Sequence, residues 1–568
     1  MSARANMRTG GQVLIDQLRI HGADTAYCVP GESYLAALDA LYDAREEIRL
    51  VVCRQEGGAA YMADAYGKLT GRPGVCLVTR GPGATNASLG VHTAFQDSTP
   101  MILIVGQVER AYLERGAFQE VDFREMYRPL SKWVAQIDDP GRIPEFVARA
   151  FTLATSGRPG PVVLVTPEDV LREPTAAADA EPYRPVQAHP GAPDMARLRE
   201  MLAAARRPIM ILGGSTWTAQ GVRDITRFAE ANRLATAVTF RRQDRFDNLH
   251  PCYAGDLGIG PSPKLAARIR EADLVIAVGT RLSEAATSGY TLFEVPRPRQ
   301  RFVHVHPGSE ELGRVYQAQL MINAGAAHFA AAAAALAPAD SSAWAASTEA
   351  AHKEFLEHAV PVPNPGAVQL GEIVATLQEQ LPPDTIVANG AGNFSGWIHR
   401  FWRYRGFGTQ VAPTSGSMGY GVPAGVAAAI AYPERTVLSF SGDGCFLMNG
   451  QELATAMHYG AAPIFFVINN GMYGTIRMHQ ERDYPGRIFG TALTNPDFAA
   501  LARSYGLHGE TVARTEDFAP AFKRARESRR AALIEIRLDP EAINTRTTLS
   551  KIREASLASR SAPTTQPK

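Results

Sequence analysis

The sequence predicts an α/β protein made of three doubly wound parallel-sheet domains in series. A chain of 568 residues is too long for a single hydrophobic core. Short apolar runs such as RRPIMILGGS and ADLVIAVGTR are typical of buried parallel strands, and helical stretches such as 222–232 alternate with them. Segments rich in proline, alanine and polar residues interrupt this alternation at 172–194 and 337–347. Each uninterrupted stretch is expected to form one domain.

These interruptions set the expected boundaries. We expect the first domain over residues 1–180, the second over 190–340 and the third over 360–545. Residues 546–568 are expected to be a polar tail, and its last part, SLASRSAPTTQPK at 556–568, is expected to be frayed.

Bulk composition favours small-molecule chemistry. The chain has 58 basic and 57 acidic residues, so no net field favours nucleic acid or a membrane surface. No apolar run reaches membrane-spanning length, and the N-terminal MSARANMRTG lacks the apolar core of a signal peptide. The 5 cysteines are widely spaced without a CxxC pair, which predicts buried thiols in a reducing compartment. We therefore expect a cytoplasmic location.

A strand, helix, strand unit is predicted in the third domain. Residues 436–440 and 463–468 are strand-like, and 450–459 between them has helical character. In a parallel sheet this unit places Asp443 and Asn470 at the carboxyl ends of two strands, where open α/β sheets bind ligands. Both side chains are then expected to face one crevice.

These strand ends could hold a magnesium diphosphate. Mg²⁺ prefers oxygen ligands, which Asp443, Asn470 and the carbonyl of Met472 could supply. Gly442 and Gly444 leave room for phosphate to approach the backbone. The alternative is that Gly-Asp-Gly is only a turn, because short glycine motifs recur by accident.

The first domain holds a second group of polar residues. An apolar strand over 50–53 runs into RQEGGAAYMADAYGKLTG, with Glu56 at the start of the predicted helix. Glu56 could transfer a proton, or it could merely cap the helix, since acids are favoured in the first turn. The GPGATN loop at 81–86 could cradle a heterocycle or simply turn the chain.

Together these motifs resemble those of a known family. The segment QEGGAAYMADAYGKLTGRPGVCLVTRGPGATN, and SGDG followed by INN with 24 residues between Gly444 and Asn469, resemble the thiamine-diphosphate enzymes of the acetolactate synthase (acetohydroxyacid synthase) large-subunit family. The resemblance covers nearly the whole chain. It implies a pyrimidine-binding first domain, a Rossmann-like central domain and a diphosphate- and Mg²⁺-binding third domain.

The resemblance also implies roles for residues around the cofactor. Glu56 would hydrogen-bond the aminopyrimidine and promote the imino tautomer, which removes the proton from thiazolium C2. Pro82 and Asn86 would lie beside the pyrimidine, and the thioether of Met418 would support the bent cofactor. The remaining matching positions are Ala391, Gly392, Asn393, Phe394, Gly416 and Ser417. Asn393 and Phe394 replace the glutamine and histidine usual in the family.

The substrate side departs further from the family pattern. AFQEVDF and SKW resemble the family's AFQE and TKH segments, so Phe118, Gln119 and Lys132 are candidates for lining the substrate pocket. The alternative for Lys132 is a solvated surface amine. Glu32 stands where relatives have glycine, and His479 replaces the tryptophan that selects the larger acceptor.

The resemblance makes FAD a candidate cofactor and predicts a homo-oligomer. Arg281 in VGTRLSE matches an arginine that contacts FAD, although the following SEAATSG departs from the family's acidic loop. The Gly213 and Gly214 pair is compatible with a nucleotide but is weak evidence. In the family the pyrimidine domain of one subunit faces the diphosphate domain of another, which implies a dimer or a tetramer.

The implied activity is a decarboxylating carboligation of 2-oxo acids. A substrate such as pyruvate would lose CO₂, and the remaining fragment would join a second carbonyl to give an acetolactate-type product. One alternative is simple decarboxylation or cleavage of a 1,2-dione, for which Glu32 or His479 could supply an acid or base. A non-catalytic paralogue is a further alternative, but it would be expected to lose the activating acid or the metal ligands.

Overall fold

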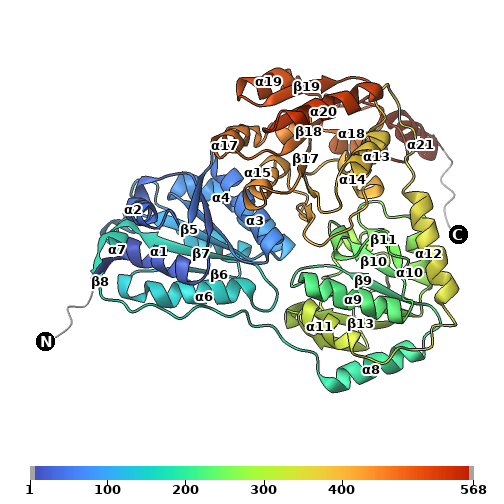
Figure 1. Cartoon of the computed structure of the whole chain (residues 1–568), viewed down its shortest axis with the longest axis horizontal. Helices are drawn as coiled ribbons and strands as arrows, with labels where there is room; N and C mark the ends of the chain where they lie inside the picture. Colours follow the sequence, from blue (N-terminus) through green and yellow to red (C-terminus); the bar gives the residue numbers. More distant parts are fainter. Residues whose placement is uncertain (1–6, 562–568) are drawn as a thin grey trace. The chain divides into compact units, whose positions relative to one another are not determined.

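The computed structural model describes residues 7–561 and confirms the predicted α/β fold. Three 6-stranded parallel sheets follow one another along the chain (Figure 1). The first two domains and residues 404–410 form one compact unit, and the third domain with the C-terminal segment forms a second. Residues 1–6 and 562–568, which include parts of the predicted N-terminal segment and tail, lie outside the described residues.

The first sheet places Glu56 and the GPGATN loop beyond the carboxyl ends of two of its strands. In spatial order the strands are β3 (Arg49–Val52), β2 (Thr25–Cys28), β4 (Gly74–Val78), β5 (Met101–Gln107), β7 (Pro161–Pro167) and β6 (Trp133–Gln136). The helices are α1 (Gly10–Ile20), α2 (Leu35–Asp43), α3 (Glu56–Thr70), α4 (Gly81–Asp97), α5 (Phe123–Tyr127), α6 (Ile143–Thr155) and α7 (Glu168–Arg172). Successive strands are added on one side of β2 and then, from β4 onward, on the other side. This reversal of the winding order makes the carboxyl ends of β2 and β4 the topological switch point. A short ribbon pairs β1 (Arg8–Thr9) with β8 (Pro174–Thr175).

Small residues let α3 and α4 pack closely. A Cβ added to Gly90 of α4 would lie 2.3 Å from the Cβ of Ala60 on α3. The two helices run side by side in Figure 1, and each begins at the carboxyl edge of the sheet. This contact fixes the start of α3, at Glu56, relative to the start of α4.

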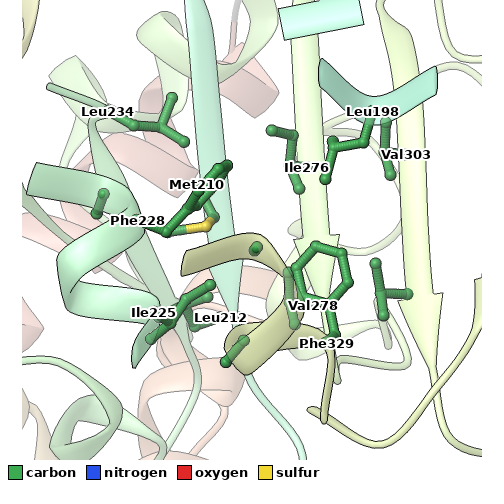
Figure 2. Packing of buried hydrophobic residues seen from close by; sticks show 14 of the residues in the cluster. Leu198, Met210, Leu212, Ile225, Phe228, Leu234, Ile276, Val278, Val303 and Phe329 are labelled. Carbon is green, nitrogen blue, oxygen red and sulfur yellow. The ribbon is translucent and has the colours of Figure 1, made fainter. Parts of the chain in front are cut away.

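The central domain has the same architecture and an apolar core. Its strands, in spatial order, are β11 (Tyr253–Leu257), β10 (Thr236–Thr239), β9 (Pro208–Leu212), β12 (Leu274–Val278), β13 (Arg301–His306) and β14 (Leu320–Asn323). The helices are α8 (Ala192–Ala203), α9 (Ala219–Ala231), α10 (Pro263–Glu271), α11 (Ala326–Ala334) and α12 (Ala345–His358). Figure 2 shows Met210 and Ile276 of the sheet among Leu198, Phe228 and Phe329 of the covering helices. The helix predicted at 222–232 is α9.

The third sheet confirms the predicted strand, helix, strand unit. Its strands, in spatial order, are β16 (Gln410–Val411), β15 (Ile386–Asn389), β17 (Val437–Gly442), β18 (Ile464–Asn469), β20 (Ala532–Arg537) and β19 (His508–Val512). The helices are α13 (Leu370–Gln380), α14 (Ser395–Phe401), α15 (Gly421–Ala431), α16 (Asp443–Phe446), α17 (Leu453–His458), α18 (Gly474–Asp483), α19 (Phe498–Ser504), α20 (Phe518–Glu527) and α21 (Leu549–Ser561). The predicted strands correspond to β17 and β18, which are parallel neighbours. The predicted helix over 450–459 is a 3₁₀ turn, Gly450–Glu452, followed by α17.

The expected fraying is wrong for residues 556–561, which belong to α21 (Leu549–Ser561). This helix packs on α18 through a buried carboxylate rather than through a broad apolar face. Glu481 of α18 is fully buried and accepts hydrogen bonds from Arg553 of α21 (2.8 Å) and from Arg477 (2.8 Å). A polar sequence therefore folds here because its arginine neutralises an acid more than 70 residues away.

None of the helices within residues 7–561 combines the length and the apolar composition needed to cross a bilayer.

The Glu481 carboxylate should stabilise the third domain in a pH-dependent way. Its hydrogen bonds to Arg553 and Arg477 lower its pKa to about 2 from an ordinary 4.5. Its contribution is therefore fully present above about pH 4.5 and is lost as the pH falls toward 2, a difference of about 3 kcal/mol. We expect Glu481→Gln to lower the Tm of the transition that includes this domain by roughly 5 °C or more at pH 7, measured by calorimetry.

The matched control is Glu516→Gln, which removes an exposed ion pair with Arg514 and should shift the Tm by less than about 1 °C. Equal effects of the two substitutions would show that α21 is not held by Glu481.

Candidate active site

Glu56 and Asn86 meet at the carboxyl edge of the first sheet. Asn86 Nδ2 donates to Glu56 Oε2 at 2.9 Å. A Cβ on Gly83 would lie 3.3 Å from Glu56 Oε1, so this glycine leaves space beside the second oxygen. Pro82 occupies the first turn of α4 and is exposed. The structure thus brings the predicted pyrimidine-binding residues together.

Glu56 is not the helix cap that the sequence left as an alternative. The N-cap of α3 is Gln55, whose side-chain oxygen accepts a hydrogen bond from Gly58 N at 3.0 Å. Because Gln55 already caps the helix, the Glu56 carboxylate is available for another role.

Of the three predicted substrate residues, Phe118 and Gln119 lie apart from Lys132. The Gln119 backbone crosses the start of α4, where a Cβ on Gly81 would lie 2.8 Å from Gln119 O. Lys132 instead precedes β6, at the amino edge of the same sheet, and its Nζ donates to Leu153 O (2.5 Å) and Ser156 O (2.7 Å) at the end of α6. Burial lowers its pKa to about 8. Lys132 is therefore neither a solvated amine nor near Glu56, and we leave it out of the site.

The loops after β2 and β4 bring an unanticipated ion pair to the switch point. Glu32 Oε1 lies 2.5 Å from Arg80 Nη2, and Ser33 Oγ lies 2.9 Å from Thr79 Oγ1. The sequence analysis missed Arg80, although its place directly before GPGATN was a usable signal.

Asp443 joins the ends of β17 and β18, as the sequence predicts. It is 2% exposed and accepts hydrogen bonds from Gly444 N (2.9 Å), Gly471 N (2.8 Å) and Asn495 Nδ2 (2.8 Å). Burial raises the pKa of the Asp443 carboxyl despite these donors. Asn470 follows β18 directly and is half-buried. The carboxylate is thereby held in one orientation between the two strand ends.

The residues present fit a magnesium ion. Asp443, Asn470 and the Met472 carbonyl form an all-oxygen set, and Met472 O keeps a lone pair beside its hydrogen bond from Gly474 N. Asn495, which the sequence analysis missed, has a buried Oδ1 with no partner in the described part of the chain. Such an acceptor beside a carboxylate suits a hydrated cation. Within residues 7–561 no cluster of three or more His, Cys, Asp or Glu side chains offers another metal site.

Asn393 and Phe394 are structural in this domain. The Phe394 ring is buried, and a Cβ on Gly392 or Gly442 would lie 3.0 or 3.2 Å from it. Asn393 accepts a hydrogen bond from Thr475 Oγ1 (2.9 Å) and donates to Met478 Sδ (3.4 Å), both on α18. These replacements brace the turn around Ala391 and Gly392 against α18.

The segment that carries Met418 is tied to the residues that follow Asp443. Gly419 N donates to Cys445 Sγ (3.2 Å), and Asn449 Nδ2 donates to Gly419 O (3.0 Å). Positive φ at Gly416 (71°) and Gly419 (79°) shapes the turn, and Ser417 Oγ lies 3.0 Å from Ser415 Oγ. Met418 is half-buried. The Met418 loop and the loop after Asp443 are therefore held together by these two hydrogen bonds.

His479, which stands where the family has a tryptophan, lies on α18 beside residues that are already paired. Arg477 is bound to Glu481, so it is not available to a substrate carboxylate. His479 Nδ1 is buried and has no hydrogen-bond partner among the described residues.

The central domain does not fit the expected flavin contact. Arg281 Nη1 donates to Gln96 O at 3.2 Å, and its Nε lies 3.2 Å from the buried carboxylate of Glu311. Glu311 also binds Arg158 at 2.9 Å. The Arg281 guanidinium is thus already paired with a buried acid of its own domain.

The glycine pair of the central domain serves packing. A Cβ on Gly214 would lie 1.8 Å from Gly279 O, and Trp217 Nε1 donates to Gly213 O at 2.9 Å. The loops after β9 and β12 therefore close on each other at the switch point.

Comparison with known proteins finds a family model for each of the three domains. Residues 8–126 match the family model for the N-terminal TPP binding domain of thiamine pyrophosphate enzymes. Residues 195–333 match the central domain and 390–536 the C-terminal TPP binding domain of the same enzymes.

Three relatives illustrate the match over the whole chain. The acetolactate synthase large subunit of Corynebacterium glutamicum is 31% identical over 549 residues, covering 93% of this chain and 86% of that protein. The isozyme 2 large subunit of Escherichia coli is 31% identical, covering 93% and 95%. The mitochondrial catalytic subunit of Saccharomyces cerevisiae is 29% identical, covering 94% and 81%. The chain therefore belongs to the acetolactate synthase large-subunit family of thiamine-diphosphate enzymes.

Proposed function

We propose that the protein is a thiamine-diphosphate- and Mg²⁺-dependent carboligase that decarboxylates a 2-oxo acid such as pyruvate and forms an acetolactate-type product. The observation that carries this proposal is the Glu56–Asn86 pair at the carboxyl edge of the first sheet, in a chain of this family. The Asp443 cluster in the third domain supports it.

The chain's own residues would activate and hold the cofactor. Bound thiamine diphosphate supplies a nucleophilic carbon and an electron sink for decarboxylation. Glu56 would exchange a proton with the aminopyrimidine, while Asn86 holds Oε2 and fixes the direction of the carboxylate. Asp443, Asn470 and the Met472 carbonyl would hold Mg²⁺, and Asn495 keeps the Asp443 carboxylate in place.

Assembly and location are further parts of the proposal. Glu56 and Asp443 belong to different compact units, and the family resemblance supports a homodimer or tetramer in which different subunits contribute them. All five cysteines are buried and none forms a disulfide, which supports a reducing compartment such as the cytoplasm.

The alternatives have less support. The relatives are named acetolactate synthases rather than decarboxylases, and the Glu32 carboxylate is paired with Arg80 instead of standing as a free acid. A non-catalytic paralogue is disfavoured because Glu56, Asp443 and Asn470 are all present.

Replacing Glu56 tests the proposed activation step. Glu56→Gln keeps the shape but cannot accept the proton, so deuterium exchange at cofactor C2 should slow by about 100-fold or more while cofactor binding persists. Exchange is followed by NMR after acid quench, and binding by calorimetry. An exchange rate equal to that of the unaltered protein would remove Glu56 from this role.

Product analysis with pyruvate tests the reaction itself. Carboligation consumes two pyruvates and releases one CO₂ for each acetolactate formed. Mass spectrometry and chiral chromatography should therefore find a chiral acetolactate in equal amount to CO₂. Acetaldehyde in equal amount to CO₂, without acetolactate, would instead support simple decarboxylation.

Asn495 should support the metal site without being a ligand. Asn495→Ala removes a donor to Asp443, so Mg²⁺-dependent cofactor binding should weaken by about 10-fold, the usual effect of losing a group that orients a metal ligand. Calorimetric titration at several Mg²⁺ concentrations measures this. Asn323→Ala, in the central domain, is the control and should bind as the parent does. Equal affinity of both variants would contradict the assigned role of Asn495.

A further inference from the structure

A buried guanidinium that the proposed mechanism does not use lies at the start of α4. Arg80 follows β4 and is 7% exposed. Its Nη2 lies 2.5 Å from Glu32 Oε1, and its Nε donates to Phe118 O at 3.2 Å. Its Nη1 has no hydrogen-bond partner within the described chain and only approaches Glu168, at 3.6 Å. Part of the donor fork is therefore unused.

Arg80 shares its loop with the residues around Glu56. A Cβ on Gly83 would lie 2.9 Å from Thr79 Cγ2 and 3.3 Å from Glu56 Oε1, and Arg80 is the residue after Thr79. Gly81, the residue after Arg80, touches the backbone of Gln119. The guanidinium thus lies at the switch point between β2 and β4, where open α/β sheets bind ligands.

The present partner of Arg80 is easily exchanged. The Glu32 side chain is 62% exposed, and ion pairs with a solvated partner contribute little net stability. A guanidinium binds a carboxylate best through two parallel N–H groups, but Glu32 contacts a single nitrogen. A second carboxylate could replace Glu32 at Nη2 and also satisfy Nη1.

We propose that Arg80 binds the carboxylate of the 2-oxo acid substrate, and that Glu32 is the counterion which this carboxylate displaces. This inference rests on the proposed function and specifies how the substrate is recognised. It gives Glu32 a role that needs no proton transfer, and it places the exposed Phe118 side chain beside the bound acid, since Arg80 already lies over its ring at 5.8 Å.

Binding without turnover tests the proposal directly. In a Glu56→Gln background loaded with thiamine diphosphate and Mg²⁺, pyruvate reacts more slowly by about 100-fold or more, so its Kd can be measured by saturation-transfer NMR before much of it is consumed. Adding Arg80→Ala should raise that Kd by about 10- to 100-fold, and Arg80→Lys, which keeps the charge but loses the fork, should give an intermediate value. Arg110→Ala is the matched control, because Arg110 bridges Asp169 and Glu173 in the same domain without reaching the loop.

Kinetics of otherwise unaltered enzyme separate recognition from activation. Arg80→Lys should raise the KM for pyruvate while C2 exchange without pyruvate keeps its parental rate. Glu32→Gln should lower the KM or leave it unchanged, because a competing carboxylate is removed.

Two results would overturn the proposal. One is a pyruvate Kd for both Arg80 variants equal to that of the Arg110→Ala control. The other is a Glu32→Gln enzyme with parental KM and abolished kcat, which would make Glu32 a proton donor. Failure of the proposed function is distinct, since it would appear as absent cofactor binding or absent C2 exchange in the unaltered protein.

Discussion

The hydrogen bond from Gly471 N to Asp443 Oδ2, at 2.8 Å, is the interaction on which the third domain's site depends. It joins the loops after two parallel strands, so it fixes the distance between the residues that each strand delivers. Asn495 and Gly444 add donors to the same buried carboxylate. A buried acid without such partners would destabilise the fold, and with them it becomes a rigid anchor.

In the first domain, the packing of two helices fixes the relative positions of the candidate-site residues. Small residues on α3 and α4 allow close contact, which brings Asn86 to Glu56 while Gln55 caps α3. The proton-transfer group and its orienting amide therefore come from two helices whose relative position is set by packing. The same loop presents Arg80 toward Glu32, so cofactor activation and substrate recognition would share one piece of backbone.

Local sequence patterns predicted the candidate-site residues that directly follow a single strand. Apolar strands followed by short polar loops located Glu56, Asp443 and Asn470, because the carboxyl ends of parallel strands share an edge. Contacts between distant segments escaped this reasoning. Asn495 lies 52 residues beyond Asp443, in a loop without a recognisable pattern. Lys132 matched a motif by position, but only the fold shows that it precedes its strand and faces the opposite edge.

The sequence also did not predict the helix α21 or the contacts of the central-domain residues. The helix α21 has no strong apolar stripe, and it is held by the ion pair between Arg553 and Glu481. In the central domain, Arg281 and the glycine pair match a nucleotide-binding pattern in sequence, but Arg281 pairs with Glu311 and Gln96 O, and the glycines let two loops approach closely.

We propose that Glu56 and Asp443 act on one cofactor while belonging to different subunits. Mixing inactive Glu56→Gln and Asp443→Ala proteins, with exchange of subunits, tests it most directly. Each mixed dimer would then contain one site with both residues intact, so carboligase activity should return to about one quarter of the parental value. No recovery of activity, with mixed dimers present by native mass spectrometry, would contradict the account.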